Sequence, residues 1–291
     1  MRVLVTGGSG FLGQRVIPEL LDRGVEVAAL ARSAEAAVRM QQLGAIPIYG
    51  DLNEPDSVDE AFQAAEADTL VNLASLGFGH APIVVAAAEE AAVRRCVFIS
   101  TTAIFTALPA ESRAVRTVAE ETIRDSALDW TIIRPTMIYG RPGDRNMERL
   151  LRLLMWAPLI PVPGGGERLL QPVYVDDLAW FVAEVARQEK AIGKEYDVPG
   201  PEPLSLRELI RLAGSSVGRT PSLLAVPLTP AVAGLRLYER VAKRPRLRPE
   251  QLLRLNEDKA FAFSAAAELG YRPRPFADGI AEEARLLRVS A

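Results

Sequence analysis

Glycines follow the first apolar run of the chain at a spacing that suits a phosphate ligand. The run Val3–Val5 leads into Gly7, Gly10 and Gly13, and a helical pattern begins at Phe11. Gly7 permits the tight turn out of the strand, Gly10 lets the backbone approach a pyrophosphate, and Gly13 lets the helix pack on the strand. The N–H groups and positive dipole end of that helix then face the phosphates. A structural turn without a ligand is the alternative, and the strand–turn–helix context favours dinucleotide binding.

Side chains that transfer protons near neutral pH are scarce in the first half of the chain. No lysine precedes Lys190, and Tyr49 is the only tyrosine before Tyr139. The single histidine, His80, follows a Gly-Phe-Gly turn at the end of a predicted strand, where ligands of parallel sheets bind. His80 is therefore a candidate general base, and a loop residue that starts a helix is the alternative.

Composition limits the class of protein. The 291 residues are 49% hydrophobic, which is enough for a packed core, and the net charge of −3 argues against a nucleic-acid partner. One cysteine, Cys96, and one histidine exclude a disulfide framework and a cysteine- or histidine-rich metal site, so no metal is expected. The fold begins at residue 2 without a signal peptide, and no uncharged apolar run reaches the ~18 residues that span a bilayer. We expect a cytoplasmic protein.

The first half of the chain alternates apolar strands with helices. Continuous apolar strands between helices indicate a parallel sheet that is covered on both faces. Right-handed crossovers then give an α/β fold with a doubly wound parallel sheet, which binds its ligand at the carboxyl ends of the strands. The predicted strands lie at 3–5, 25–31, 46–49, 69–73, 97–100 and 130–134, and the predicted helices at 11–23, 33–43, 54–66, 82–93 and 111–126.

The character of the sequence changes after Gly140, where prolines and glycines interrupt the alternation. Residues 1–140 are therefore predicted to be the dinucleotide-binding domain, and residues 141–291 a smaller, mostly helical lobe that closes over the nucleotide and holds the substrate. Residues 172–187, a short strand and a helix, are expected to rejoin the main sheet. Further helices of the second lobe are predicted at 147–156, 205–217, 228–242 and 276–289.

Seven short motifs resemble the short-chain dehydrogenase/reductase superfamily, in its extended and atypical branches of epimerase/dehydratase-like proteins. They span nearly the whole chain and read TGGSGFLG at 6–13, GDL at 50–52, LAS at 73–75, STTA at 100–103, RPTMIYG at 134–140, PVYVDDLA at 172–179 and LGY at 269–271. The resemblance implies a Rossmann fold and an NAD(P) cofactor, although many activities share this fold. It implies cofactor contacts at Thr6, Gly7, Gly8, Ser9, Gly10, Phe11, Leu12, Gly13, Asp51, Leu52, Leu73, Ala74, Ser75, Ser100 and Pro135.

The chain departs from this family at the catalytic pair. In the family a Tyr-x-x-x-Lys lies on the helix before the sixth strand, and the corresponding positions here hold Ser112 and Arg116. Arg116 can bind a ribose hydroxyl, but a guanidinium does not give up a proton. Ser112 is a poor acid or base without an activating neighbour. A solvated first helical turn is the alternative interpretation of both residues.

Two other residues are candidates for catalysis. Thr102 matches the family's catalytic Ser/Thr, which hydrogen-bonds a substrate oxygen, and a hydroxyl that caps a strand end is the alternative. Tyr139 lies beyond the sixth strand at the predicted mouth of the site, where it is the phenol best placed to face a substrate or else a packing residue. Hydride transfer itself needs a bound cofactor and some proton source, which water can provide.

The end of the second predicted strand bears on the choice of cofactor. An acidic side chain there would bind the adenosine ribose hydroxyls, whereas this chain has Arg32 and Ser33. A guanidinium and a hydroxyl beside a helix start suit a 2′-phosphate. We therefore expect NADP(H) rather than NAD(H).

Three functions fit these residues. The first is an NADP(H)-dependent reductase of a small carbonyl or quinone-like molecule, with an unusual proton donor. The second is a non-catalytic nucleotide-binding redox sensor or structural subunit, and the third is a nucleotide-sugar epimerase or dehydratase. The expected partner is a small-molecule substrate, and the protein is expected to be a monomer or a homodimer.

A basic segment lies beside an apolar one late in the chain. Residues 227–237 are apolar, and basic side chains crowd the region that follows. This pair of segments suits peripheral contact with a lipid surface, a protein partner or an acidic substrate group, and a solvated helix face is the alternative. The basic residues are Arg236, Arg240, Lys243, Arg244, Arg246, Arg248 and Arg254.

Overall fold

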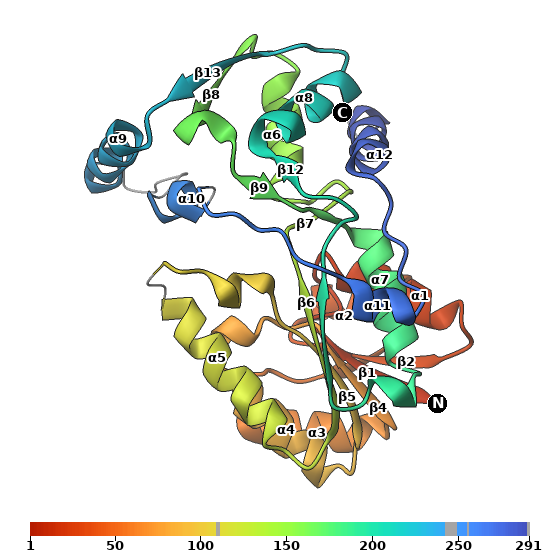
Figure 1. The fold of residues 1–291 in the computed structure, drawn as a ribbon. Coiled ribbons are helices and arrows are strands. Elements are labelled where there is room, and N and C mark those ends of the chain that lie inside the picture. The colour runs from red at the N-terminus through yellow and green to blue at the C-terminus, as the bar shows by residue number, and fades with distance from the viewer. Residues whose placement is uncertain (109–110, 242–248, 255, 290–291) are drawn as a thin grey trace.

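Seven parallel strands form one sheet at the centre of the molecule (Figure 1). The computed structural model describes residues 1–108, 111–241, 249–254 and 256–289. The strands of the sheet are β1 (Arg2–Thr6), β2 (Glu26–Ala31), β3 (Ile46–Tyr49), β4 (Thr69–Asn72), β5 (Arg95–Ile99), β6 (Asp129–Pro135) and β11 (Lys194–Val198).

The strand order is β11-β6-β5-β4-β1-β2-β3, so the chain reverses its direction of winding between β1 and β4. Doubly wound sheets bind ligands at such a switch point, at the carboxyl ends of the strands. Helices cover both faces of the sheet, which confirms the predicted doubly wound α/β fold. One face carries α1 (Gly13–Leu21), α2 (Ala34–Gln42), α7 (Val175–Val185) and α11 (Ser264–Glu268), and the other carries α3 (Pro55–Ala65), α4 (Ala81–Glu90) and α5 (Glu111–Arg124).

The inner part of the sheet is buried on both faces because successive residues of its strands are apolar, as in β1. Val3 and Val5 of β1 pack into the core beneath α1 and α7, whereas Leu4 between them packs into the core beneath α3 and α4. All three side chains have no exposed surface. Full burial of such a side chain contributes ~1.5–3 kcal/mol. The continuous apolar runs that predicted a parallel sheet therefore fill two separate cores.

One strand of the sheet, β11, comes from the second half of the chain and was not predicted. It pairs with β6, with Tyr196 opposite Ile133. Tyr196 and Val198 are buried, and they alternate with the charged residues Glu195 and Asp197 along the edge of the sheet. Short edge strands with charged side chains are typical of natural sheets, and they lack the apolar run that reveals an inner strand.

Above the sheet in Figure 1 lies a second lobe with its own core. Three helices, α6 (Met147–Leu154), α8 (Leu206–Ser216) and α12 (Phe276–Val289), pack together there. The lobe also holds three strand pairs. These are β7 (Ile138–Tyr139) with β10 (Val173–Tyr174), β9 (Leu169–Leu170) with β12 (Leu204–Ser205), and β8 (Leu159–Pro163) with β13 (Ser222–Val226). The strand at 173–174 was predicted, but it pairs within this lobe and not in the main sheet as expected. The other strands were not predicted, because these pairs are short or contain proline.

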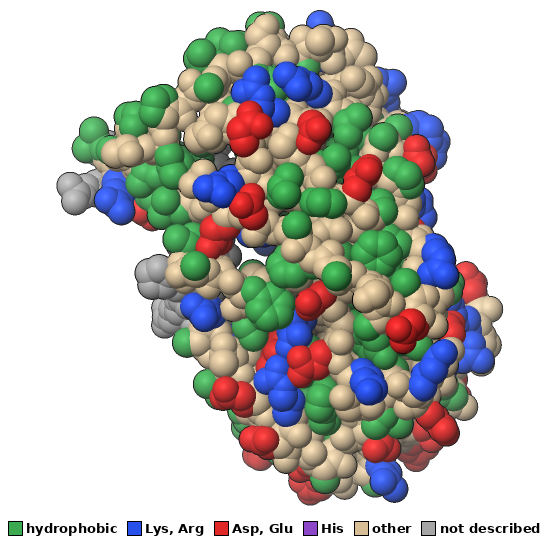
Figure 2. All heavy atoms as spheres, in the orientation of Figure 1, with side chains coloured by type: hydrophobic (Ala, Val, Ile, Leu, Met, Phe, Trp, Pro, Cys, Tyr) green, Lys and Arg blue, Asp and Glu red, His purple; other side chains and the backbone are tan. Residues whose placement is uncertain are grey.

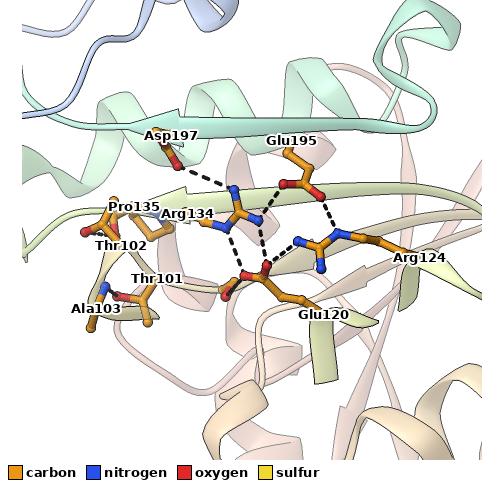
Figure 3. Close-up of polar contacts among 10 residues, drawn as sticks. Thr101, Thr102, Ala103, Glu120, Arg124, Arg134, Pro135, Glu195 and Asp197 are labelled. Carbon is orange, nitrogen blue, oxygen red and sulfur yellow. Dashed lines mark hydrogen bonds and ion pairs between the residues drawn. The ribbon is translucent and has the colours of Figure 1, made fainter. Parts of the chain in front are cut away.

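A buried ion network joins α5 to strands β6 and β11 (Figure 3). Glu120 of α5 has no exposed surface, and its carboxylate accepts from Arg134 Nε (2.9 Å) and Nη2 (2.5 Å). Arg134 Nη2 also donates to Glu195 (2.5 Å), and Arg124 bridges both carboxylates at 2.8 and 2.5 Å. The Ser100 hydroxyl donates the remaining bond to Glu120 (2.6 Å). Although burial opposes its charge, these carboxylates raise the pKa of Arg134 above its ordinary value.

We predict that Glu120→Gln destabilises the fold by about 3 kcal/mol or more, because it leaves the Arg134 charge buried without its main partner. The free energy of unfolding in urea measures this loss. Glu282→Gln is the control, since Glu282 forms an exposed pair with Arg285 and its loss is expected to leave the free energy of unfolding nearly unchanged. Equal stability of the two variants would contradict a structural role for the network.

A second buried carboxyl lies in the core of the upper lobe. Glu283 of α12 is fully buried, and among the described residues neither of its oxygens has a hydrogen-bond partner of normal geometry. Burial raises the pKa of Glu283 to about 8, and the nearby Asp144 carboxylate contributes to this rise. Glu283 is therefore protonated in the folded protein at neutral pH, whereas in the unfolded chain it is ionised.

The folded state thus binds one more proton than the unfolded state between pH 4.5 and about 8. Stability from this group is complete below pH 4.5 and is lost as pH rises through the folded pKa, at up to ~1.4 kcal/mol per pH unit. We predict that Glu283→Gln flattens the profile of unfolding free energy against pH in this window. Glu282→Gln on the same helix serves as the control and should retain the wild-type slope.

Candidate nucleotide and substrate sites

The glycine turn between β1 and α1 has no room for side chains. Gly7 has a φ of +68°, and a Cβ there would lie 2.8 Å from the backbone nitrogen of Ala74. A Cβ at Gly13 would lie 2.5 Å from the carbonyl oxygen of Gly8. Both positions therefore require glycine. A Cβ at Gly10 would meet only the Gly7 oxygen, at 3.0 Å, so this exposed position leaves its outer side open to a ligand.

The same turn offers amide donors to an anion. The Gly10 N–H donates to the Gly7 carbonyl (2.9 Å) and the Gln14 N–H to the Gly10 carbonyl (3.1 Å), which fixes the loop. The first N–H groups of a helix have no acceptor within the helix, and together with the helix dipole they attract phosphate. A dinucleotide diphosphate fits this turn, because Gly10 has no side chain to fill the space through which the phosphates approach the backbone.

A cavity of about 510 Å³ extends from the glycine turn over the carboxyl ends of β2, β3 and β4. It brings together most of the side chains and backbone segments that the sequence indicated for the cofactor. These are Gly7, Ser9, Gly10, Arg32, Ser33, Asp51, Leu52, Leu73, Ala74 and Ser75. The sequence analysis missed several other residues of its wall, namely Leu30, Glu35, Ala36, Arg39, Gly50, Asn53 and Phe78.

Three residues with an expected cofactor contact have side chains that are directed into the protein. The Thr6 hydroxyl is fully buried and donates to Asn72 (2.6 Å), which ties β1 to β4. The Leu12 side chain belongs to the core beneath α1. The Ser100 hydroxyl donates to the buried carboxylate of Glu120. Each of these side chains has an internal contact that stabilises the fold, and a cofactor contact through the backbone of these residues stays a prediction.

Positive charge gathers where β2 ends. Arg32 and Ser33 line the cavity as expected, and Arg39, two turns into α2, joins them there. Ser33 caps α2 by accepting from the Ala36 N–H (3.3 Å), and its hydroxyl lowers the pKa of the exposed Glu35 carboxyl. The sequence signal for Arg39 was its place four residues after Glu35 on one face of the predicted helix 33–43, and it reaches the cavity because α2 packs on the sheet.

His80 lies at the opposite wall of the nucleotide cavity. Its Nε2 lies 3.2 Å from Asn53 Oδ1, and Asn53 in turn donates through N–H (3.0 Å) and Nδ2 (2.7 Å) to the Asp51 carboxylate. The Asn53 amide, followed by the charges of Arg32 and His80, lowers the pKa of Asp51. His80 precedes α4, as its alternative interpretation proposed, and it does not line the cavity that contains Thr102.

A second cavity, of about 390 Å³, opens beyond the carboxyl end of β5. Thr102 lines it from the short helix η2 (Thr102–Phe105), and its hydroxyl donates to the Pro135 carbonyl at 3.3 Å (Figure 3). The opposite wall is residues 256–261, a segment that we call the strap. The sequence analysis missed the strap, because nothing in its local pattern indicates a site.

Two adjacent residues of the strap, Glu257 and Asp258, are held by hydrogen bonds from different parts of the fold. Glu257 accepts from the Thr106 hydroxyl (2.6 Å) and the Ala107 N–H (2.9 Å), both beside the end of η2. Asp258 accepts from Arg168 (2.8 Å) and the Leu169 N–H (3.0 Å). The strap therefore bridges the loop after β5 and the upper lobe, and it closes one side of the Thr102 cavity.

Tyr139 does not face a substrate, and its expected catalytic role is corrected. The side chain is fully buried between the rings of Tyr174 and Phe276, with centroid distances of 5.5 and 5.0 Å. Its hydroxyl donates to the Phe276 carbonyl at 3.4 Å, and a Cβ at Gly279 would lie 2.3 Å from that hydroxyl. Burial raises the pKa of Tyr139 above its ordinary value. The residue packs the upper lobe, as its alternative interpretation proposed.

Arg116 lies on α5 with its guanidinium against η1 (Leu76–Phe78). A Cβ at Gly77 would lie 3.0 Å from Arg116 Nη2, so the absence of a side chain there makes room for the arginine. Phe78, the next residue, lines the nucleotide cavity. The Ser112 side chain lies outside the described residues. Arg116 thus borders the nucleotide site, but it does not line the cavity of Thr102.

The upper left of Figure 2 shows apolar side chains gathered over α9 (Leu228–Val241) and β13. Leu224, Leu237 and Tyr238 are exposed there. Much of the basic segment noted in the sequence, including residues 243–248, falls outside the described residues. Within the described part of the chain, no helix has the length and hydrophobicity to cross a bilayer, and no cluster of acidic, histidine and cysteine side chains suits a metal ion.

Comparison with known proteins places these features in a family. Residues 7–151 match the family model described as NAD(P)H-binding. The chain is similar to a 4-hydroxy-2-methyl-3-oxo-4-farnesyl-3,4-dihydroquinoline-1-oxide ketoreductase of Stigmatella aurantiaca, with 28% identity over 94% of this chain and 92% of the relative. It is also similar to a 2-alkyl-3-oxoalkanoate reductase of Stenotrophomonas maltophilia, with 29% identity over 75% and 76% of the two chains.

A third relative is named as a subunit of a complex and not as a reductase. This is the mitochondrial NADH dehydrogenase [ubiquinone] 1 alpha subcomplex subunit 9 of Arabidopsis thaliana, with 25% identity over 79% of this chain and 61% of the relative. Among solved structures, the UDP-glucose 4-epimerase of Thermus thermophilus in complex with NAD covers all of both chains, with a TM-score of 0.77 and 20% identity. The chain thus carries an NAD(P)-binding Rossmann domain, is similar in sequence to reductases, and shares its fold with a UDP-glucose 4-epimerase.

Proposed function

We propose that this protein is an NADP(H)-dependent reductase of a ketone in a lipophilic small molecule. The observation that carries the proposal is the pairing of two cavities at the carboxyl edge of the sheet. One has the shape and the donors for a dinucleotide, and the other presents the Thr102 hydroxyl beside aromatic rings. The nucleotide turn follows β1 and Thr102 follows β5, two strands that only β4 separates in the sheet.

The substrate class is inferred from the second cavity and from the relatives. Phe105 and Phe261 face each other in its wall, with ring centroids 5.8 Å apart. The two reductases to which the chain is similar are named for substrates with an oxo group next to long alkyl or farnesyl chains. These two rings offer an apolar surface to a lipophilic chain, in a wall that otherwise carries polar and charged side chains.

The residues of the chain have distinct roles in this reaction. The glycine turn binds the diphosphate, and Arg32, Ser33 and Arg39 bind a 2′-phosphate. Bound NADPH supplies the hydride to the carbonyl carbon. The Thr102 hydroxyl turns from the Pro135 carbonyl to donate to the substrate oxygen and stabilises the charge that develops there. The strap excludes water from one side of the cavity.

A non-catalytic nucleotide-binding subunit is the second candidate function. It is favoured by the replacement of the family's Tyr-x-x-x-Lys by Ser112 and Arg116, and by the relative that is named as a subunit of NADH dehydrogenase. The epimerase or dehydratase alternative is weaker. Arg141, a candidate for a sugar-nucleotide diphosphate, is already paired with Asp176 at 2.5 Å.

We predict that the protein oxidises NADPH when it is supplied with 2-hexyl-3-oxodecanoate or a related 2-alkyl-3-oxo acid. Thr102→Val should lower kcat about 100-fold by removing a donor to the developing oxyanion, while the Kd for NADPH stays within about twofold. NADPH absorbance at steady state and calorimetry measure the two quantities. Thr117→Val, on the exposed face of α5, is the control and should match the wild type.

The outcome separates the two candidate functions. Tight NADPH binding with flat absorbance traces for 3-oxo acids, other ketones and quinones would contradict the reductase and favour the non-catalytic subunit.

We also predict that Arg32→Ala with Arg39→Ala weakens NADPH binding about 10- to 100-fold, because charge-assisted hydrogen bonds to the 2′-phosphate contribute ~1.5–3 kcal/mol. NADH lacks this phosphate, so its Kd should change less than about twofold. Isothermal titration calorimetry with both nucleotides measures the difference. Arg187→Ala, at an exposed position away from the cavity, is the control. An equal loss for NADH and NADPH would show that the arginines do not select the phosphate.

A further inference from the structure

A lysine from late in the chain lines the same cavity as Thr102. Lys259 belongs to the strap, and it is separated by more than 150 residues from the loop that it faces. Its backbone is fixed, because its N–H donates to the Leu169 carbonyl at 2.8 Å. The Phe261 N–H, two residues on, donates to the Gln171 side chain at 2.8 Å. These bonds place the lysine reproducibly at the cavity wall.

Reduction of a ketone needs a proton for the oxygen as well as a hydride for the carbon. The Thr102 hydroxyl can donate a hydrogen bond, but it is too weak an acid to remain deprotonated afterwards. Tyr139 is buried in the upper lobe, and His80 lines the nucleotide cavity rather than this one. Neither this tyrosine nor this histidine is therefore placed to give a proton to the substrate oxygen.

The other charged groups of the cavity are unsuited to give up a proton. Arg168 pairs with Asp258 and does not release a proton at accessible pH. Glu257 accepts two hydrogen bonds from the loop after η2. An ammonium differs from all of them, because it is charged at neutral pH, can give up a proton and can regain one from water. Lys259 is therefore the side chain of this cavity that is suited to proton transfer.

We propose that Lys259 is the proton donor of the reaction and replaces the missing Tyr-x-x-x-Lys pair from a different part of the fold. This inference rests on the proposed reductase function. As the carbon–hydrogen bond forms with hydride from NADPH, the carbonyl oxygen takes a proton from Lys259 Nζ and becomes a hydroxyl. Two electrons pass from the nucleotide to the ketone, and the neutral amine regains its proton from water. Thr102 holds the oxygen while the proton moves.

The first test compares three variants in the NADPH oxidation assay with 2-hexyl-3-oxodecanoate. Lys259→Met should lower kcat about 100-fold or more, which is the range that general acids contribute, and leave the Kd for NADPH within about twofold. Lys259→Arg keeps the charge but cannot release a proton, so it should be nearly as slow as Lys259→Met. Lys194→Met is the control, since Lys194 is exposed on β11 and outside the Thr102 cavity.

The wild-type kcat should fall at high pH as the donor loses its proton, and Lys259→Arg should lack this decline. A fast Lys259→Arg enzyme would show that only the charge is needed, and a fast Lys259→Met enzyme would show that the lysine is not needed at all. Either result overturns the proposal while the reductase function stands. A wild-type protein that binds NADPH and reduces no ketone contradicts both.

A second measurement does not depend on turnover. The four lysines of the chain, at 190, 194, 243 and 259, can be reductively methylated with ¹³C and observed by NMR. Saturation with NADP⁺ and 2-hexyl-3-hydroxydecanoate should shift the resonance that disappears in Lys259→Arg, and it should leave the resonance of Lys194 unchanged. If calorimetry shows that the alcohol binds and the Lys259 resonance does not move, the lysine does not contact the substrate oxygen and the proposal fails.

Discussion

The close approach of backbone to backbone at the end of β1 is the constraint on which both cavities depend. A side chain at Gly7 would enter the chain between Leu73 and Ala74, and one at Gly13 would enter the carbonyl of Gly8. The turn can therefore form only with glycine at these two positions, and it sets the distance between α1 and the ends of β1 and β4. That spacing produces the opening at the switch point of the sheet, in which a diphosphate meets the helix amides.

The buried ion network fixes the strand ends in the half of the sheet that holds β5, β6 and β11, as the glycine turn fixes those in the other half. Glu120 ties α5 to β6 through Arg134 and to the end of β5 through Ser100. β11 is joined to the same cluster by Glu195. Removal of one member leaves a charge in the interior, so the cluster holds the strand ends in one arrangement. Thr102 lies just beyond those ends, and its position at the cavity follows from that arrangement.

The residues that the sequence could predict are those whose role is local. The glycine turn, the strand runs and the pair Arg32–Ser33 each depend on neighbours within a few residues, and the structure places them at one cavity. Arg39 required the packing of α2, and β11 required its pairing with β6. Tyr139 follows the sixth strand in the chain, as expected. Its side chain turns away from the sheet because the aromatic rings of the upper lobe surround it.

The strap shows why the missing Tyr-x-x-x-Lys does not by itself exclude chemistry. In a doubly wound sheet, any segment that crosses the carboxyl edge can reach the substrate, wherever it lies in the sequence. Residues 256–261 make that crossing here, and hydrogen bonds to the carboxylates of Glu257 and Asp258 hold them on both sides. A proton donor needs a titratable group at the substrate oxygen and a route to water, and neither requirement specifies α5. The fold therefore fixes the place of the reaction, while the residue that supplies the proton is free to differ.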